Sequence, residues 1–169
     1  MGGGSMKKIA LVFLALFILS GCEQRLPPEW QPHLKYVYHI SPYDLAEIPP
    51  SDATTYFMDN TYFLPSGKWF RTVSAKYSPF GKPSRVWDCD DYARDFQVFA
   101  RKRYASEAIK DFTAPQGLAV FTITLNGEQK HALNLVLTND AGMLLYEPQT
   151  KTIRPASATE LSRIIYLGD

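Results

Sequence analysis

The pattern of hydrophobic and polar positions in the second half of the chain predicts one long helix followed by three strands. Apolar side chains recur at helical spacing from Tyr92 to Tyr104, which is typical of a helix with one buried stripe. Asp88 stands directly before this run and is the expected capping residue. Three apolar or β-branched segments follow, bounded by turn-forming residues, at 118–125, 131–137 and 143–147. We expect these strands to form an antiparallel meander behind the helix.

The remaining segments are shorter. Ser157 and Glu160 have the spacing of a capping box, which predicts a short helix before a last strand over residues 164–167. Residues 51–70 are aromatic and are interrupted by turn residues, which indicates short irregular elements rather than a long helix. Residues 22–50 are rich in proline and predict a partly extended tether. The expected globular domain therefore covers residues 51–169.

The N-terminal residues predict a targeting segment. Two lysines precede an apolar run over residues 9–19, and the sequence Leu-Ser-Gly-Cys ends at Cys22. This order resembles a bacterial lipoprotein signal over residues 6–21, in which the cysteine receives the lipid. The apolar run is shorter than the roughly 20 residues that span a bilayer, so a permanent membrane helix is the weaker interpretation. Residues 1–5 resemble an expression tag.

This resemblance implies a membrane partner and a location. A protein acylated at Cys22 would be lipid-anchored at the bacterial cell envelope, on the periplasmic face. Glu23 after that cysteine favours the outer membrane over the inner membrane. The net charge of +1 shows no basic excess, so we expect no nucleic-acid partner.

Cys89 is the one cysteine outside the signal region, and an exported protein normally pairs its cysteines. It stands in the predicted first turn of the helix, where unpaired N–H groups favour a negatively charged sulfur. Three aspartates surround it, and their charge opposes ionisation of the thiol. A small buried cysteine is the alternative interpretation, but three carboxylates do not suit a core.

His131 is the candidate base for a nucleophilic Cys89. It starts a predicted strand, and Glu147 ends the next one. If the turn between these strands is centred near Asn139, positions 131 and 147 are directly opposed, and the carboxylate can orient the imidazole. A turn centred on Asp140 would move the pair out of step. A partly buried strand histidine and an ordinary strand-end charge are the alternatives for the two residues.

Two stretches carry a family resemblance. The sequence "DCDDYA" around Cys89 resembles the signature of bacterial transglutaminase-like cysteine proteinases, which depend on calcium and cleave biofilm adhesins. The stretches "HALNLVL" and "LLYEPQT" are similar to the papain-like protease domain of the Marasmius oreades agglutinin. The resemblance covers roughly residues 85–152. It implies an α+β, papain-like or transglutaminase-like fold, with an N-terminal catalytic helix packed on an antiparallel sheet.

The resemblance also implies roles for the site residues. Cys89 would be the nucleophile, His131 the general base and acid, and Glu147 the orienting group of a cysteine protease or amide hydrolase. The partner would be a protein or peptide substrate in the envelope. Asp88 and Asp90, with Asp91 as a further candidate, would bind calcium. The alternative for these aspartates is that they cap the helix and oppose its dipole.

Trp87 is placed to contact a substrate, although packing in the core explains it equally well. Two other functions remain open. One is a cell-wall peptidase of the NlpC/P60 type, which the aspartates after Cys89 argue against. The other is a non-catalytic binding or exclusion lipoprotein of the envelope with the same fold.

Overall fold

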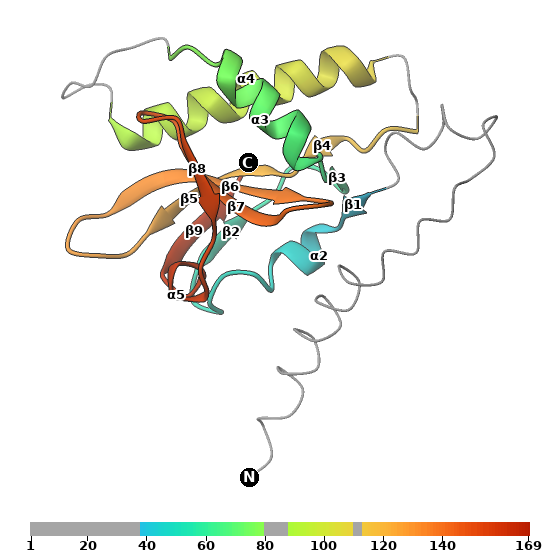
Figure 1. Ribbon diagram of the computed structural model, residues 1–169. Coiled ribbons are helices and arrows are strands. Elements are labelled where there is room, and N and C mark those ends of the chain that lie inside the picture. Colours follow the sequence, from blue (N-terminus) through green and yellow to red (C-terminus); the bar gives the residue numbers. More distant parts are fainter. Residues whose placement is uncertain (1–37, 80–87, 110–112) are drawn as a thin grey trace. The chain divides into compact units, whose positions relative to one another are not determined.

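The computed structural model describes residues 38–79, 88–109 and 113–169. Its largest element is a six-stranded sheet with the order β2-β9-β5-β6-β7-β8 (Figure 1). The strands are β2 (Thr54–Tyr56), β5 (Val120–Leu125), β6 (His131–Thr138), β7 (Gly142–Glu147), β8 (Thr152–Pro155) and β9 (Ile164–Gly168). All neighbours pair antiparallel except β2 and β9, which are parallel.

A smaller sheet and four helices complete the described structure. The sheet has the order β1-β3-β4, from β1 (His39–Ile40), β3 (Tyr62–Phe63) and β4 (Gly117–Leu118). The helices are α2 (Pro42–Leu45), α3 (Gly67–Lys76), α4 (Cys89–Ala108) and α5 (Ala158–Leu161). No helix among these residues is long and apolar enough to cross a membrane.

Helix α4 covers one face of the central strands. Its N-cap is Asp88, which forms a capping box with Asp91. The buried stripe of α4 packs with α3 and with one face of β5, β6 and β7 in a core that includes Phe70, Phe96, Ala100, Tyr104, Val120, Val136 and Tyr146. The rings of Phe96 and Tyr146 lie 4.3 Å apart between centroids, so the helix and the sheet share one aromatic layer.

The opposite face of the sheet has its own core. The alternate residues of the same strands pack there with α2, including Leu45, Phe121, Ile123, Leu133, Leu135, Leu145 and Leu167. Leu45 is fully buried, and β1 pairs with β3. Residues 39–45, within the segment that the sequence predicts as a tether, therefore pack against the domain.

Two buried side-chain amides hold α4 on the sheet. The Gln97 side chain is buried and donates to the carbonyl oxygens of Val120, at 2.9 Å, and Gly168. On the sheet side, Asn134 donates to the carbonyl of Ala93 at 2.9 Å. Buried amides of this kind need their partners, so they set where along the sheet the helix lies.

The observed fold corrects the predicted fold class. The predicted class has an N-terminal catalytic helix on an antiparallel sheet, but α4 follows five other elements in the described chain, and the sheet is mixed because β2 joins β9 in parallel. The structure is mostly strands with one long helix. The prediction failed because it rested on residues 85–152, whereas the parallel pair is made by segments outside that range.

Individual elements agree better with the sequence pattern. The helix cap at Asp88, the meander β5-β6-β7 and the capping box of Ser157 and Glu160 are confirmed. Helix α3 and strand β8 were missed. The predicted irregular region ends inside α3, whose N-cap Ser66 accepts a hydrogen bond from the Trp69 N–H at 3.1 Å.

A charged network fixes the end of the chain. The Asp169 side chain is 1% exposed and accepts hydrogen bonds from the Met58 N–H at 2.8 Å and the Tyr62 hydroxyl at 3.0 Å. It also pairs with Arg101 of α4 at 3.1 Å, and Arg101 pairs in turn with Asp59. The network joins α4, the last strand and the segment after β2.

We expect Asp169→Asn to lower the free energy of unfolding by about 2–3 kcal/mol, because it removes a charge that three donors share in a buried place. Urea unfolding followed by circular dichroism measures this. Glu128→Gln, in the exposed turn after β5, is the control and should change it by less than about 0.5 kcal/mol. Equal stability of the two variants would show that the network does not hold the chain end.

Candidate functional site

Cys89 is the first residue of α4 and lies against the start of β6. Its sulfur accepts a hydrogen bond from the Ala132 N–H at 3.4 Å. The thiol is free and half-buried. The capping box positions it: the Asp88 carboxylate accepts from the Asp90 N–H at 3.3 Å, and the Asp91 carboxylate accepts from the Asp88 N–H at 3.1 Å. The helix start is thereby held in one conformation.

His131, at the start of β6, and Glu147, at the end of β7, form a hydrogen-bonded pair. Imidazole Nε2 contacts Glu147 Oε2, and Oε1 of the same carboxylate accepts from the Gln149 N–H at 3.3 Å. The His131 side chain is 47% exposed and that of Glu147 is 21% exposed. Both oxygens of the Glu147 carboxylate therefore accept or share a hydrogen bond, which fixes its orientation. The pair uses Nε2 of the solvent-accessible imidazole and does not use Nδ1.

The register that joins this pair differs from the predicted one. Asn134 pairs with Tyr146 and Thr138 with Gly142, so the turn is centred on Asp140 and Glu147 is not directly opposite His131. The pair still meets because the shift amounts to two residues, which keeps both side chains on the same face and makes them diagonal neighbours. The expectation that such a turn would separate them was wrong.

The structure brings His131 and Glu147 into contact, and it brings Cys89 into contact with Ala132 rather than with His131. Cys89 comes from α4, His131 from the start of β6 and Glu147 from the end of β7. Ala132, whose N–H contacts the sulfur, directly follows His131 in the chain. The arrangement combines a thiol at a helix start with an oriented imidazole, which are the parts that a reactive thiol needs.

The three aspartates lie close together. One carboxylate oxygen from each of Asp88, Asp90 and Asp91 falls within 4.8 Å of the others. The pKa of Asp88 is lowered, mainly by hydrogen bonding from the Asp90 side chain and N–H. The pKa of Asp90 is raised by the same side-chain hydrogen bond, by partial burial and by the negative charge of Asp88. Asp90 also pairs with Arg94 at 3.1 Å, and this positive charge offsets part of the negative charge near the thiol.

Two predicted site residues lie outside the described residues. They are Trp87, the candidate substrate contact, and Cys22, the candidate lipidation site. The structure therefore adds nothing to either prediction.

A cavity of about 380 Å³ adjoins the Cys89 site, and the sequence analysis missed it. It lies beside the first two turns of α4, on strands β2, β5 and β9, and its lining is Thr54, Asp90, Arg94, Thr122, Thr124, Lys130, Ile165 and Tyr166. We call it the hydroxyl cavity. The signal for it was present in β5, where threonines occupy two positions of the face that a helix would otherwise cover with apolar residues.

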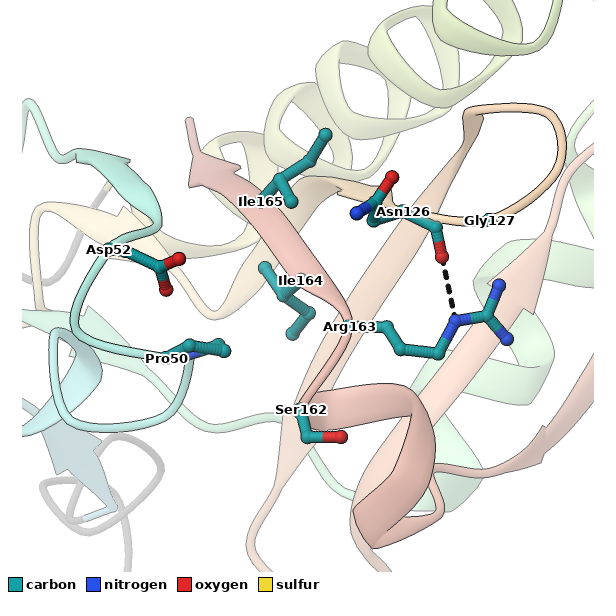
Figure 2. Close-up of a pocket in the computed structure, with 8 residues that line it drawn as sticks. All are labelled: Pro50, Asp52, Asn126, Gly127, Ser162, Arg163, Ile164 and Ile165. Carbon is teal, nitrogen blue, oxygen red and sulfur yellow. Dashed lines mark hydrogen bonds between the residues drawn. The ribbon is translucent and has the colours of Figure 1, made fainter.

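A second cavity of about 430 Å³ lies at the far end of the same strands (Figure 2). Its lining comes from the segment before β2, the turn after β5 and the start of β9: Pro50, Asp52, Asn126, Gly127, Ser162, Arg163, Ile164 and Ile165. We call it the arginine cavity. None of Cys89, His131 and Glu147 lines it, so it is separate from the thiol site.

Comparisons with known proteins give matches among solved structures alone. No family model and no curated protein matches the sequence. The PSL1a–E64 complex is 17% identical, with a TM-score of 0.60, over 78% of this chain and 50% of that chain. Polyporus squamosus lectin bound to the human-type influenza-binding epitope Neu5Aca2-6Galb1-4GlcNAc is 19% identical, with a TM-score of 0.53, over 73% and 45% of the two chains. This chain spans about half the length of those structures.

These matches correct the predicted class. The similar structures are those of a lectin, so the interpretation as a papain-like or transglutaminase-like cysteine protease was wrong, and so was the cell-wall peptidase. These structures give no support to a peptide substrate. The alternative of a non-catalytic binding protein agrees better with them. The resemblance rested on short motifs around a capped helix start and an oriented histidine. This fold contains both local features, but its similar structures are of another class.

Proposed function

We propose that this domain is a binding module of the bacterial cell envelope and that its ligand is a saccharide. The observation that carries the proposal is the hydroxyl cavity beside the Cys89 site. Hydroxyl groups and charged side chains line it on one face of the sheet, which suits a ligand that is itself rich in hydroxyl groups. The likeness to a lectin structure with a bound trisaccharide supports this ligand class.

The hydroxyl cavity has unused hydrogen-bonding capacity. Within the described residues, the side-chain hydroxyls of Thr54, Thr124 and Tyr166 and the ammonium of Lys130 have no intramolecular partner. Thr122, by contrast, donates to Gln97 Oε1 at 3.0 Å and is 5% exposed. The free groups lie on adjacent strands, because Tyr166 pairs with both Thr124 and Thr54. The three hydroxyls of Thr54, Thr124 and Tyr166 therefore lie together on one surface of the sheet.

Thr54→Val should weaken saccharide binding roughly fivefold, because it removes one hydrogen bond worth about 1 kcal/mol. Thr55→Val is the matched control, since Thr55 is exposed in the same strand but does not line the cavity. Saturation-transfer NMR with neutral hexoses, N-acetylhexosamines and hexuronates measures the binding. No binding by any of these sugars would contradict the proposed function.

We also propose that Cys89 is a reactive thiol, with His131 accepting its proton and Glu147 orienting the imidazole. Two observations favour this. The sulfur accepts from the N–H of Ala132, the residue after His131 in the chain, and His131 is itself hydrogen-bonded to Glu147. Backbone N–H groups directed at the sulfur favour its anionic form. A binding module with such a thiol can react with an electrophilic group of its ligand.

The test is alkylation by iodoacetamide in a Cys22→Ser background, where Cys89 is the one remaining thiol. His131→Ala should lower the second-order rate constant at pH 7 at least tenfold, because the proton loses its acceptor, and Glu147→Gln should lower it less. His39→Ala, at another exposed histidine, is the control. A rate in His131→Ala equal to that of the parent protein would exclude the proposed role.

We further propose that Asp88, Asp90 and Asp91 bind calcium. Carboxylate oxygens suit this hard cation, and those of the three residues lie within 4.8 Å of one another. Asp88 and Asp91 each have a second oxygen besides the one used in the capping box, and Asp90 has one besides the Oδ2 that pairs with Arg94. A bound cation would neutralise the charge that these groups place next to Cys89, and would hold the start of α4 in place.

Calcium should raise the melting temperature by on the order of 5 °C when its concentration is about 100 times the Kd. Asp90→Asn should remove most of that rise, whereas Glu128→Gln, at an exposed residue of the turn after β5, should keep it. Differential scanning fluorimetry with calcium and then with a chelator measures both. If chelation changes neither variant nor parent, these aspartates only cap the helix.

The envelope location rests on the N-terminal segment. We propose that Cys22 carries the lipid and that the domain is tethered to the periplasmic face, with the outer membrane favoured by Glu23. A saccharide-binding module in that position would meet glycans at the cell surface or in the wall.

A further inference from the structure

The arginine cavity is built around one guanidinium that the chain holds in a fixed position. Arg163 Nε donates to the carbonyl oxygen of Asn126 at 2.7 Å, and the Asn126 N–H donates back to the carbonyl of Arg163 at 2.8 Å (Figure 2). These reciprocal bonds join the turn after β5 to the residue before β9. Because they involve Nε, they leave the two Nη groups of the fork available.

Gly127 makes room for this side chain. A Cβ atom at position 127 would lie 2.5 Å from Arg163 Nη2, closer than unbonded atoms approach. The guanidinium therefore lies directly over the glycine, and a side chain there would displace the end of Arg163, with a smaller contact against the Gln129 carbonyl oxygen at 3.3 Å. The turn thus holds the arginine by two hydrogen bonds and by the absence of a side chain beneath it.

The guanidinium has no carboxylate partner in the part of the chain that the structure describes. Asp52 lines the same cavity but lies across Ile164 from Arg163, and the two form no ion pair (Figure 2). An arginine with a free planar fork matches the geometry of a carboxylate, which it binds through two parallel hydrogen bonds. Pro50 and the two isoleucines supply apolar surface between Asp52 and Arg163.

We infer that the arginine cavity binds a carboxylated sugar unit, with its carboxylate on Arg163. The side chains of Asn126 and Asp52 can then bond to ring hydroxyls, and the apolar residues pack against the C–H face of the ring. A volume of about 430 Å³ is sufficient for such a unit. This inference rests on the proposed saccharide binding and adds to it the class of saccharide and a second place of contact.

The two cavities are linked by one residue. Ile165 lines both the arginine cavity and the hydroxyl cavity, on either side of the start of β9. An oligosaccharide chain with one acidic unit can therefore contact Arg163 at one end and the threonines at the other. The acidic unit belongs at the arginine cavity because the planar fork of Arg163 can bind a carboxylate through two parallel hydrogen bonds. In the hydroxyl cavity, Arg94 pairs with Asp90 at 3.1 Å, and Lys130 offers a single ammonium rather than a fork.

The experiment compares D-glucuronate with D-glucose by saturation-transfer NMR, on the full chain and on three variants. Arg163→Gln should weaken glucuronate binding at least tenfold and leave glucose binding within twofold, because only the acid uses the fork. Gly127→Ala should weaken glucuronate about as much, since the new Cβ displaces Nη2. Arg71→Gln, at an exposed arginine of α3, is the control and should bind like the parent.

The possible results separate this inference from the proposed function. If glucuronate and glucose bind equally well, or if Arg163→Gln binds glucuronate like the parent, the inference is overturned while saccharide binding stands. If no sugar binds at all, both fall. Selective loss of glucuronate in Arg163→Gln and Gly127→Ala, with Arg71→Gln unchanged, supports the inference. Circular dichroism of each variant confirms that the loss does not come from unfolding.

Discussion

The position of α4 on strands β5 and β6 is the constraint on which the rest of the structure depends. The helix is held by apolar packing around Phe96 and, more specifically, by Gln97 and Asn134, whose amides bond to backbone across the interface. Apolar contacts alone would tolerate sliding, but a buried amide without its partner costs roughly 1–3 kcal/mol. This fixed position places Cys89 against the Ala132 N–H, which belongs to the residue after His131 in the chain.

The same helix leaves part of the sheet uncovered. Helix α4 lies over the central strands, while the threonines and the tyrosine of β5, β9 and β2 face the space beside its first turns. Burying this polar surface would cost free energy, because its hydroxyl groups would lack hydrogen-bond partners. As the floor of an open cavity, it stays hydrated or bonds a ligand. The thiol site and the hydroxyl cavity are thus neighbours because a single helix is too narrow to cover all of these strands.

The aspartates around Cys89 have roles at the start of α4, and these roles explain why three carboxylates lie near a thiol whose ionisation they oppose. Asp88 and Asp91 are occupied by the capping box, and Asp90 pairs with Arg94 and has a raised pKa because it shares a hydrogen bond with Asp88. The negative charge near the sulfur is therefore smaller than the count of carboxylates suggests. The motif is explained by helix capping first, and this local explanation holds whether the domain binds or reacts with its ligand.

The sequence by itself determined the elements whose cause is local. The start of α4 at Asp88, the strands of the meander and the capping box at Ser157 follow from contacts within four residues and from simple alternation. The pairing of His131 with Glu147 followed from the order of two neighbouring strands, although the assumed register was wrong. It survived because a shift of two residues keeps a side chain on its face.

Tertiary structure alone decided the class of the fold and the cavities. The parallel pairing of β2 with β9 joins segments separated by more than a hundred residues, and no local sequence pattern predicts it. Both cavities are lined by residues from three or more such segments, and the place of Arg163 depends on a turn that precedes it by more than thirty residues. Short motifs around Cys89 suggested a proteinase because they record local geometry. The fold is set by long-range packing, which those motifs do not contain.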